Sequence, residues 1–105
     1  LENLQVENKE SEINSQLPSK LGLLSVYPNP FNPVCQLQFE LIYDSKIALQ
    51  IYDINGKFIV ELANSFLMAG RHVYTWNAEF SPSGLYLAKL VSPSGVWTKK
   101  LLLLK

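Results

Sequence analysis

The sequence predicts an all-β fold, a seven-stranded antiparallel β-sandwich, and three observations predict it. From residue 23 onward, apolar and polar residues alternate over short stretches such as Gln36–Leu41, which is the period of a strand with one buried face. Turn-forming Gly, Pro, Asn and Ser separate these stretches at roughly regular spacing. The stretches between the turns have no helical period, so short strands in two packed sheets are the arrangement expected.

The composition limits the classes of protein that need to be considered. The chain of 105 residues is long enough for one domain, and its 48% hydrophobic content is ample for a core. Its formal net charge of zero argues against a nucleic-acid partner or an anionic membrane held by bulk charge. Neither a transmembrane run nor a signal-peptide pattern is visible. Because the first residue is Leu1 rather than Met, we expect a fragment of a longer protein.

The beginning of the chain is expected to be a flexible linker, residues 1–22, ahead of a folded domain, residues 23–105. Polar residues dominate the linker, and such a composition buries too little apolar surface to offset chain entropy. A short strand is expected at Leu23–Tyr27. It leads into Tyr27–Pro33, where three prolines remove backbone donors, so neither a helix nor a central strand can continue.

Two strands and a hairpin are expected next, at Gln36–Leu41, at Lys46–Asp53 and beyond the turn at Asn55-Gly56. This Asn-Gly pair fits either a two-residue type I′ turn or a type I turn closed by a Gly bulge. The strand after it is expected to cover residues 57–62. Strict alternation then predicts the following inward-facing side chains: Leu37, Phe39 and Leu41; Ile47, Leu49 and Ile51; and Phe58, Val60 and Leu62.

The last three strands follow the same logic. A turn at Met68–Gly70 precedes a strand at His72–Asn77 with Tyr74 and Trp76 on one face, and we expect Trp76 to be the central residue of the core. After the loop Ala78–Gly84, the strand Leu85–Val91 is expected to place Tyr86, Ala88 and Leu90 on one side. A turn at Ser92–Gly95 leads to the final strand, Val96–Leu104.

Catalysis and metal binding are not indicated by the residues. Cys35 and His72 fall in different expected strands with no third group beside them, and one His with one Cys is too few for a metal site. We therefore expect a buried structural cysteine at Cys35 and a hydrogen bond from His72 to a loop. Asp44 and Asp53 fall at turns, where they are expected to accept hydrogen bonds from local backbone donors. The prediction is a protein that is not an enzyme and uses no cofactor or metal.

Two surface features leave alternatives open. Tyr43, Tyr52 and Trp97 could form an exposed aromatic platform for carbohydrate, although cross-strand aromatic pairing is the simpler explanation. In Leu101–Leu104 alternate leucines face opposite sides of a strand, so one pair has no core of its own. That pair is covered by the linker or a neighbouring domain, or it is a docking surface that another protein binds through strand pairing or apolar contact. A dimer through this strand also stays open.

The ordered set of motifs resembles the type A C-terminal sorting domains of the type IX secretion system. It begins with Tyr27–Pro33, continues with the alternating Gln36–Leu41 and includes Ile51–Lys57. Further matches lie at Ala69–His72, Trp76–Asn77, Ser83–Tyr86 and Lys100–Lys105. The resemblance spans about residues 24 to 105, and the immunoglobulin-like domain of the flagellar hook-capping protein is similar to the same pattern. One departure is Asn77–Ser83, a stretch that is longer in many relatives.

The resemblance implies an immunoglobulin-like sandwich at the end of a larger secreted protein. Such a domain is a signal read by the outer-membrane machinery of Bacteroidetes-like bacteria. The machinery exports an N-terminal cargo domain via the periplasm to the cell surface or the medium. In many members a sortase removes the sorting domain and attaches the cargo to lipopolysaccharide, and cleavage would fall in residues 1–22.

Carried onto this chain, the resemblance also implies which residues the translocon recognises. They are Pro28, Asn29, Pro30, Gly84, Tyr86, Lys100, Leu101, Leu102, Leu103, Leu104 and Lys105. Our hypothesis is that Leu102 and Leu104, or whichever pair of these leucines faces outward, form the recognition surface. The alternative functions are a carbohydrate-binding module and a structural accessory module of a secreted enzyme.

Overall fold

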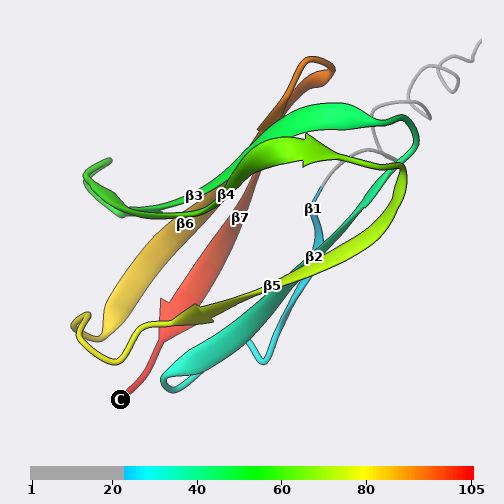
Figure 1. Cartoon of the computed structure of the whole chain (residues 1–105). Coiled ribbons are helices and arrows are strands. Elements are labelled where there is room, and N and C mark those ends of the chain that lie inside the picture. Colours follow the sequence, from blue (N-terminus) through cyan, green and yellow to red (C-terminus); the bar gives the residue numbers. More distant parts are fainter. Residues whose placement is uncertain (1–22) are drawn as a thin grey trace, which may run out of the picture.

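The computed structural model describes residues 23–105, which form seven strands. The strands are β1 (Leu23–Tyr27), β2 (Val34–Leu41), β3 (Ser45–Asp53), β4 (Phe58–Leu67), β5 (Gly70–Asn77), β6 (Gly84–Ser92) and β7 (Gly95–Leu103). They make a three-stranded sheet in the order β1-β2-β5 and a four-stranded sheet in the order β4-β3-β6-β7, antiparallel throughout (Figure 1). The predicted β-sandwich is confirmed. The expected linker, residues 1–22, lies outside the described residues.

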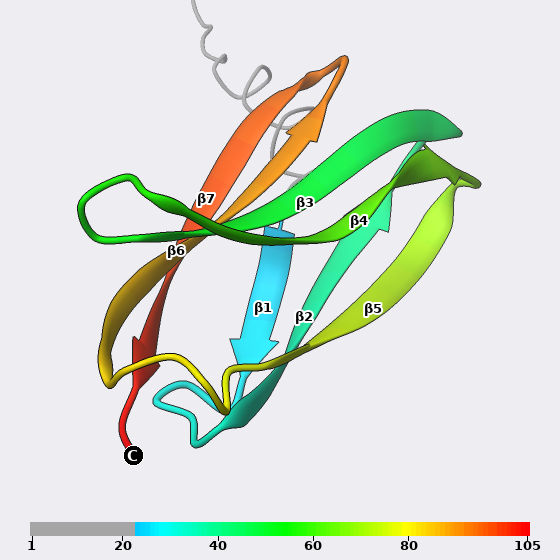
Figure 2. The same cartoon turned by 60° about the vertical axis from the view of Figure 1, so that its left-hand side comes forward.

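The division of strands between the sheets is immunoglobulin-like with one exchange. In constant-type immunoglobulin domains the fourth strand joins the first, second and fifth, whereas here β4 pairs with β3 in the other sheet. The β1–β2 connection, the β5–β6 loop and the C-terminus gather at one end of the molecule, as both views show (Figures 1 and 2). None of the described residues belongs to a helix long and apolar enough to traverse a bilayer.

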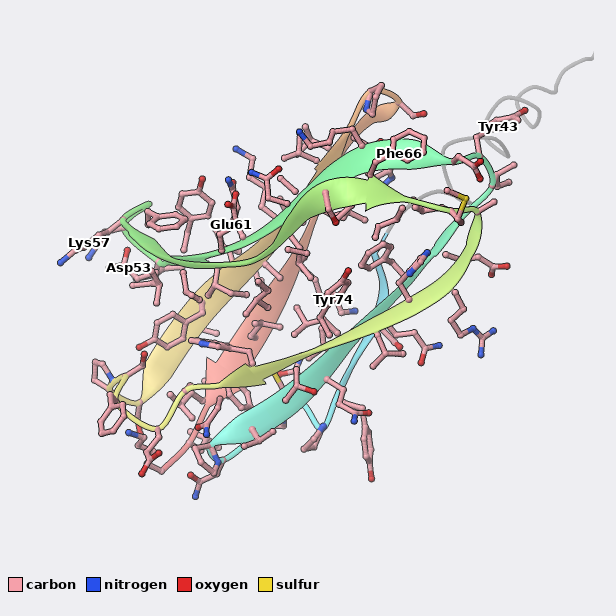
Figure 3. The ribbon with its side chains drawn as sticks, viewed as in Figure 1. Tyr43, Asp53, Lys57, Glu61, Phe66 and Tyr74 are labelled. Carbon is pink, nitrogen blue, oxygen red and sulfur yellow. The ribbon has the colours of Figure 1, made fainter. Side chains whose placement is uncertain are left out.

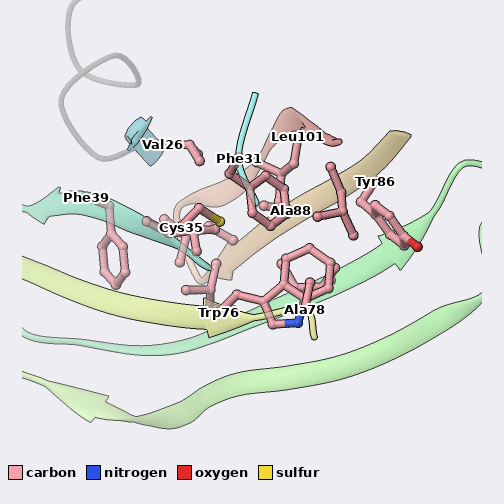
Figure 4. Close-up of a cluster of buried hydrophobic side chains, with 14 of the residues drawn as sticks. Val26, Phe31, Cys35, Phe39, Trp76, Ala78, Tyr86, Ala88 and Leu101 are labelled. Atoms are coloured by element: carbon pink, nitrogen blue, oxygen red, sulfur yellow. The ribbon is translucent and has the colours of Figure 1, made fainter. Parts of the chain in front are cut away.

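The core lies between the sheets and contains most of the side chains expected to face inward (Figure 4). All three inward residues predicted on each of β2, β3 and β6 are buried. Trp76 on β5 is buried too, with its ring centroid 5.5 Å from that of Phe31 and 5.2 Å from that of Tyr86. Phe31 comes from the proline segment and Tyr86 from the opposite sheet, so Trp76 joins three parts of the fold. Its predicted central place is confirmed.

The inward set expected for β4 is wrong at Phe58, whose side chain is 51% exposed. The pairing of β3 with β4 shifts register twice, once after Leu49 and once after Ile51. The second shift falls between the pairs Ile51–Val60 and Tyr52–Phe58, so β4 has one extra residue there, and Val60 and Phe58 lie on opposite faces. Phe58 therefore lies on the outer face, edge-on to Tyr52 at 5.8 Å between ring centroids. The other two predicted residues of β4 are half-buried against the core, and the strand continues to residue 67.

The β3–β4 hairpin adopts the second of the two predicted turn forms. The Gly56 amide donates to the Asp53 carbonyl at 3.0 Å and Gly56 has a φ of +86°, so a type I turn is closed by a Gly bulge. One carboxylate oxygen of Asp53 accepts from the amides of Asn55 and Lys57, at 2.9 Å each, as expected for a turn aspartate (Figure 3). Asp44 instead accepts from the Ala69 amide at 2.8 Å, and so ties together two neighbouring turns.

Candidate functional site: strand β7 and the proline segment

The two residues considered for catalysis have structural surroundings. Cys35 is fully buried, and this burial raises the pKa of its thiol to about 11, so the thiol stays protonated at neutral pH. The His72 Nε2 atom lies 2.8 Å from the carbonyl oxygen of Met68 in the β4–β5 turn. Both expectations are confirmed. Within residues 23–105, His, Cys, Asp and Glu do not form any group of three that could hold a metal ion.

The aromatic platform considered for carbohydrate is not assembled. Tyr43 is exposed in the β2–β3 connection (Figure 3), whereas Tyr52 lies near the opposite end of β3. Trp97 pairs opposite the buried Leu90 and is partly buried against the core. Tyr52 forms the cross-strand aromatic pair with Phe58, which is the simpler explanation offered by the sequence.

The proline segment between β1 and β2 runs beside the C-terminal half of β7, which is an edge strand of its sheet. The Phe31 amide donates to the Leu102 carbonyl at 2.9 Å, and the Leu104 amide donates to the Phe31 carbonyl at 3.0 Å. These bonds make a parallel bridge between Phe31 and Leu103. The end of the chain is therefore hydrogen-bonded on both sides, to β6 and to a segment about seventy residues earlier.

Asn29 extends this contact through its side chain. Its amide nitrogen Nδ2 donates to the Lys100 carbonyl at 3.0 Å, and its Oδ1 accepts from the Leu102 amide at 3.0 Å. Because Pro28 and Pro30 have no backbone N–H, neither neighbour of Asn29 can donate a backbone hydrogen bond to the Lys100 carbonyl. A carboxamide has one acceptor and a donor group side by side, as a peptide group does. The Asn29 side chain therefore takes the place of a strand residue next to β7.

The four terminal leucines divide into two pairs. Leu101 and Leu103 are fully buried in the core, at 0% exposure. Leu102 is half-buried on the outer face and Leu104 is 52% exposed. Leu102 pairs opposite Leu85 of β6, which is also exposed, so apolar surface continues across both strands. The outward pair of the recognition hypothesis is therefore Leu102 and Leu104.

Lys105, at the end of the sequence, contacts the loop between β5 and β6. Its backbone amide donates to the Ser83 hydroxyl at 2.9 Å, and its ammonium group donates to the Glu79 carbonyl. Beside these contacts a groove of about 410 Å³ lies between this loop and the β3–β4 hairpin. Exposed apolar residues of the groove are Ile54, Phe80 and Leu85, and Phe80 is 94% exposed.

Gly84 and Tyr86 are the members of the expected recognition set on β6, and both act inside the fold. Tyr86 is only 4% exposed, and its hydroxyl donates to the Pro82 carbonyl at 2.6 Å. This is the tyrosine corner of immunoglobulin-like sandwiches, a Tyr near the start of the sixth strand bonded back to the preceding loop. Gly84 pairs opposite Leu103 with a φ of +152°, a value that residues with a side chain rarely adopt.

The structure thus brings the whole expected recognition set to one edge of the sandwich, on β7, on its neighbour β6 and on the proline segment. Sequence reasoning did not single out Phe31, Ser83 or Glu79, which hold the end of the chain in place. Their partners lie 22 or more residues away in the sequence, so no local sequence pattern indicates these contacts. The two aromatic residues beside the prolines, Tyr27 and Phe31, indicate a packed segment, and of these two Phe31 is the buried one.

The chain matches a known protein family. A family model described as a secretion system C-terminal sorting domain matches residues 25–104. The matched region runs from within β1 to one residue short of the C-terminus, so it includes both the proline segment and β7. No curated protein matches the chain.

Proposed function

The chain belongs to the family of C-terminal sorting domains of the type IX secretion system, and from this premise we propose how it acts. Residues 23–105 direct a cargo domain attached at their N-terminal end, through the outer-membrane machinery, to the cell surface or the medium. The route passes through the periplasm. The machinery is the first partner, and a sortase that cleaves within residues 1–22 is the second.

One observation carries this proposal. The segments that the family resemblance assigns to recognition are far apart in the sequence, at Pro28–Pro30, Gly84–Tyr86 and Lys100–Lys105, yet hydrogen bonds and strand pairing unite them. A single surface at one end of the sandwich is what a partner protein needs in order to read a folded domain. The convergence supports recognition of the folded form.

Within this surface, burial divides the residues into two roles. Lys100, Leu102, Leu104 and Lys105 keep side-chain surface that a partner can contact. The buried members of the set, such as Tyr86 and the inward leucines, determine the shape and stability of the edge. We propose that the machinery contacts the first group and depends on the second group through folding alone.

The test is an export assay with a fluorescent reporter that carries a signal peptide and is fused to residues 1–105, in a host with the type IX system. A version truncated after Lys100 would be a poor variant, because it also removes two fully buried leucines, and each loss costs about 2–5 kcal/mol. Leu104→Gln is better, because it changes an exposed side chain. Val73→Gln is its matched control, since Val73 is an exposed apolar residue on the outer face of the other sheet.

We expect the wild-type and Val73→Gln reporters outside the cell and the Leu104→Gln reporter in the periplasm, with all three domains melting at similar temperatures. Retention of the wild-type reporter would overturn the sorting function itself. Export of the Leu104→Gln reporter at the wild-type level would overturn the assignment of the surface. Mass spectrometry of the exported reporter would show whether the junction in residues 1–22 is cut.

A further inference from the structure

In the N-terminal half of β7 the backbone groups that point away from β6 have no hydrogen-bond partner among residues 23–105, although β1 of the other sheet lies near part of β7. Leu102 directs its N–H and C=O away from β6, because these groups bond to Asn29 and Phe31. In an antiparallel pair the direction of these groups repeats every second residue, so the groups of Thr98 and Val96 point the same way. Among residues 23–105 no other segment is hydrogen-bonded to them, since the contacts of the proline segment begin at the Lys100 carbonyl.

This edge is also regular. The pairing of β6 with β7 runs from Ser92–Gly95 to Gly84–Leu103 without a register shift. The other edge strand of the same sheet, β4, has two register shifts against β3, and such irregularities hinder pairing with a further strand. Val96 and Thr98 on β7 are exposed and β-branched, which suits an added strand. The open half of β7 can therefore accept a strand in a way that β4 cannot.

The charges along this edge have one sign. From Gly84 to the C-terminus the chain has four lysines, at positions 89, 99, 100 and 105, and no Asp or Glu. Lys99 and Lys100 are exposed on β7, whereas the Lys89 ammonium group lies 5.4 Å from the centroid of the Tyr52 ring on β3, away from this edge. Opposite charges facing each other across two strands stabilise the pair and like charges oppose it. The complement of this edge is an extended segment with carboxylates.

We propose that the Val96–Lys100 edge of β7 binds an acidic extended segment of the export machinery, which adds to the four-stranded sheet as a fifth strand. Backbone hydrogen bonds to Val96 and Thr98 provide the attachment. Lys99 and Lys100 lie on opposite faces of the strand, so a carboxylate opposite either lysine provides selectivity. The inference rests on the proposed function for the identity of the partner. It adds residues 96–99 to the recognition surface and specifies the partner's chemistry.

A second copy of the chain is a poorer occupant of the same edge. Antiparallel pairing of two β7 strands over residues 96–100 would bring Lys99 and Lys100 of both copies, on the two faces of the strand, into one short two-strand ladder. No carboxylate lies on either β6 or β7 to compensate them. Like charges in such a ladder are destabilising, and lysines on edge strands are a common protection against self-association.

The first test measures binding of two fluorescent peptides to the 1–105 chain, one of alternating Glu and Val and one of alternating Lys and Val. Thr98→Pro removes the outward N–H, whereas the bonds to β6 come from the neighbouring residues, so the sheet can keep its pairing. Thr98→Val keeps the N–H and is the matched control. A melting curve for each variant verifies that the domain is folded.

We expect the Glu peptide to bind and the Lys peptide not to bind. Thr98→Pro should weaken binding of the Glu peptide about tenfold, the effect of losing one ordinary hydrogen bond, while Thr98→Val binds as wild type. The double variant Lys99→Glu/Lys100→Glu leaves the backbone edge intact and should reverse the preference between the peptides. Equal binding of both peptides to wild type, or unchanged binding in Thr98→Pro, would overturn the inference, as would a concentration-dependent dimer in sedimentation.

The second test separates this inference from the proposed function. The wild-type, Thr98→Pro and Thr98→Val domains are fused to the export reporter. Failure of the wild-type fusion would count against sorting as such. Export of the wild-type and Thr98→Val fusions with retention of a folded Thr98→Pro fusion would support strand addition, and equal export of all three would refute it while leaving the sorting function in place.

Discussion

Asn29 is the residue whose role the structure defines most sharply, and Asn29→Ala tests it. The substitution removes the carboxamide that bonds to the Lys100 carbonyl and the Leu102 amide. It leaves both prolines and the Phe31 backbone bonds unchanged. Asn32→Ala is the matched control, because Asn32 is exposed in the same segment and is likewise followed by a proline.

The expected loss of stability follows from the two hydrogen bonds. A typical hydrogen bond contributes about 0.5–1.5 kcal/mol net to folding, so two contribute about 1–3 kcal/mol. Both bonds are exposed, and water can replace the carboxamide in part, so we expect about 1–2 kcal/mol. For a domain of this size each 1 kcal/mol lowers Tm by roughly 4–8 °C, which predicts a fall of roughly 4–16 °C.

Thermal and urea unfolding measure the loss, and hydrogen exchange at the Leu102 amide localises it. Asn29→Asp adds a further discrimination: it keeps an acceptor for the Leu102 amide but directs a second oxygen at the Lys100 carbonyl. We therefore expect Asn29→Asp to be no more stable than wild type at neutral pH. The reasoning is refuted if Asn29→Ala has the same Tm as Asn32→Ala and the Leu102 amide exchanges no faster than in wild type. In that case the Asn29 side chain does not hold β7 in place.

Three further predictions concern the core. Trp76→Ala should lower the free energy of unfolding by about 3–5 kcal/mol in urea titrations, because the ring is buried between the sheets. A loss no larger than that caused by Val73→Ala, at an exposed position, would contradict this prediction. Tyr86→Phe should cost about 1–2 kcal/mol by removing the bond to Pro82, and a variant as stable as wild type would show that the corner is dispensable. Burial raises the pKa of Cys35 from 9.0 to about 11, so between these pH values the folded state retains a proton that the unfolded state loses. The stability contributed by this group should therefore be constant below pH 9 and fall as the pH approaches 11. The difference in unfolding free energy between wild type and Cys35→Ala, followed from pH 7 to pH 11, measures that fall, and a constant difference would refute it.

Alternation predicted the fold wherever a strand is regular over its whole paired length. Strands β2 and β6 each pair with at least one neighbour in unbroken register, so every second residue faces the core as the pattern requires. The turns followed from residues with special backbone preferences, such as Gly56 with its positive φ. These are local causes, and a sequence displays them directly.

Strand β4 is the case in which the alternation of apolar and polar residues fails to predict the inward side chains. Its outer face has Phe58, which is as apolar as the core residues, and the register shift between Val60 and Phe58 is what places that side chain in solvent. A bulge is determined by the fit between two strands and with the opposite sheet, and neither strand encodes it alone. The assignment of β4 to the four-stranded sheet is a property of the same kind.

The candidate site was predictable as a set of residues but not as an arrangement. The resemblance named Pro28–Pro30 and the terminal residues separately, and physical reasoning pointed to the alternate leucines of Leu101–Leu104. Strand pairing at the C-terminal leucines was one expected mode of docking. In the folded domain the chain's own Asn29 and Phe31 occupy that edge. The edge proposed for strand addition lies earlier in β7, at residues 96–99, before the Lys100 carbonyl that Asn29 occupies, and no local pattern indicated it.

The proline segment and the terminal strand are therefore one feature rather than two signals. The end of an edge strand that is paired on one side only tends to fray, because few contacts hold its last residues. Asn29 and Phe31 supply the second side, and so they fix the outward direction of Leu102 and Leu104. In the proposed function the machinery reads the exposed side chains at the end of β7, and the proline segment acts on recognition by ordering them. The first and last elements of the folded domain must both be in place before that surface exists, which makes the surface a property of the completed fold.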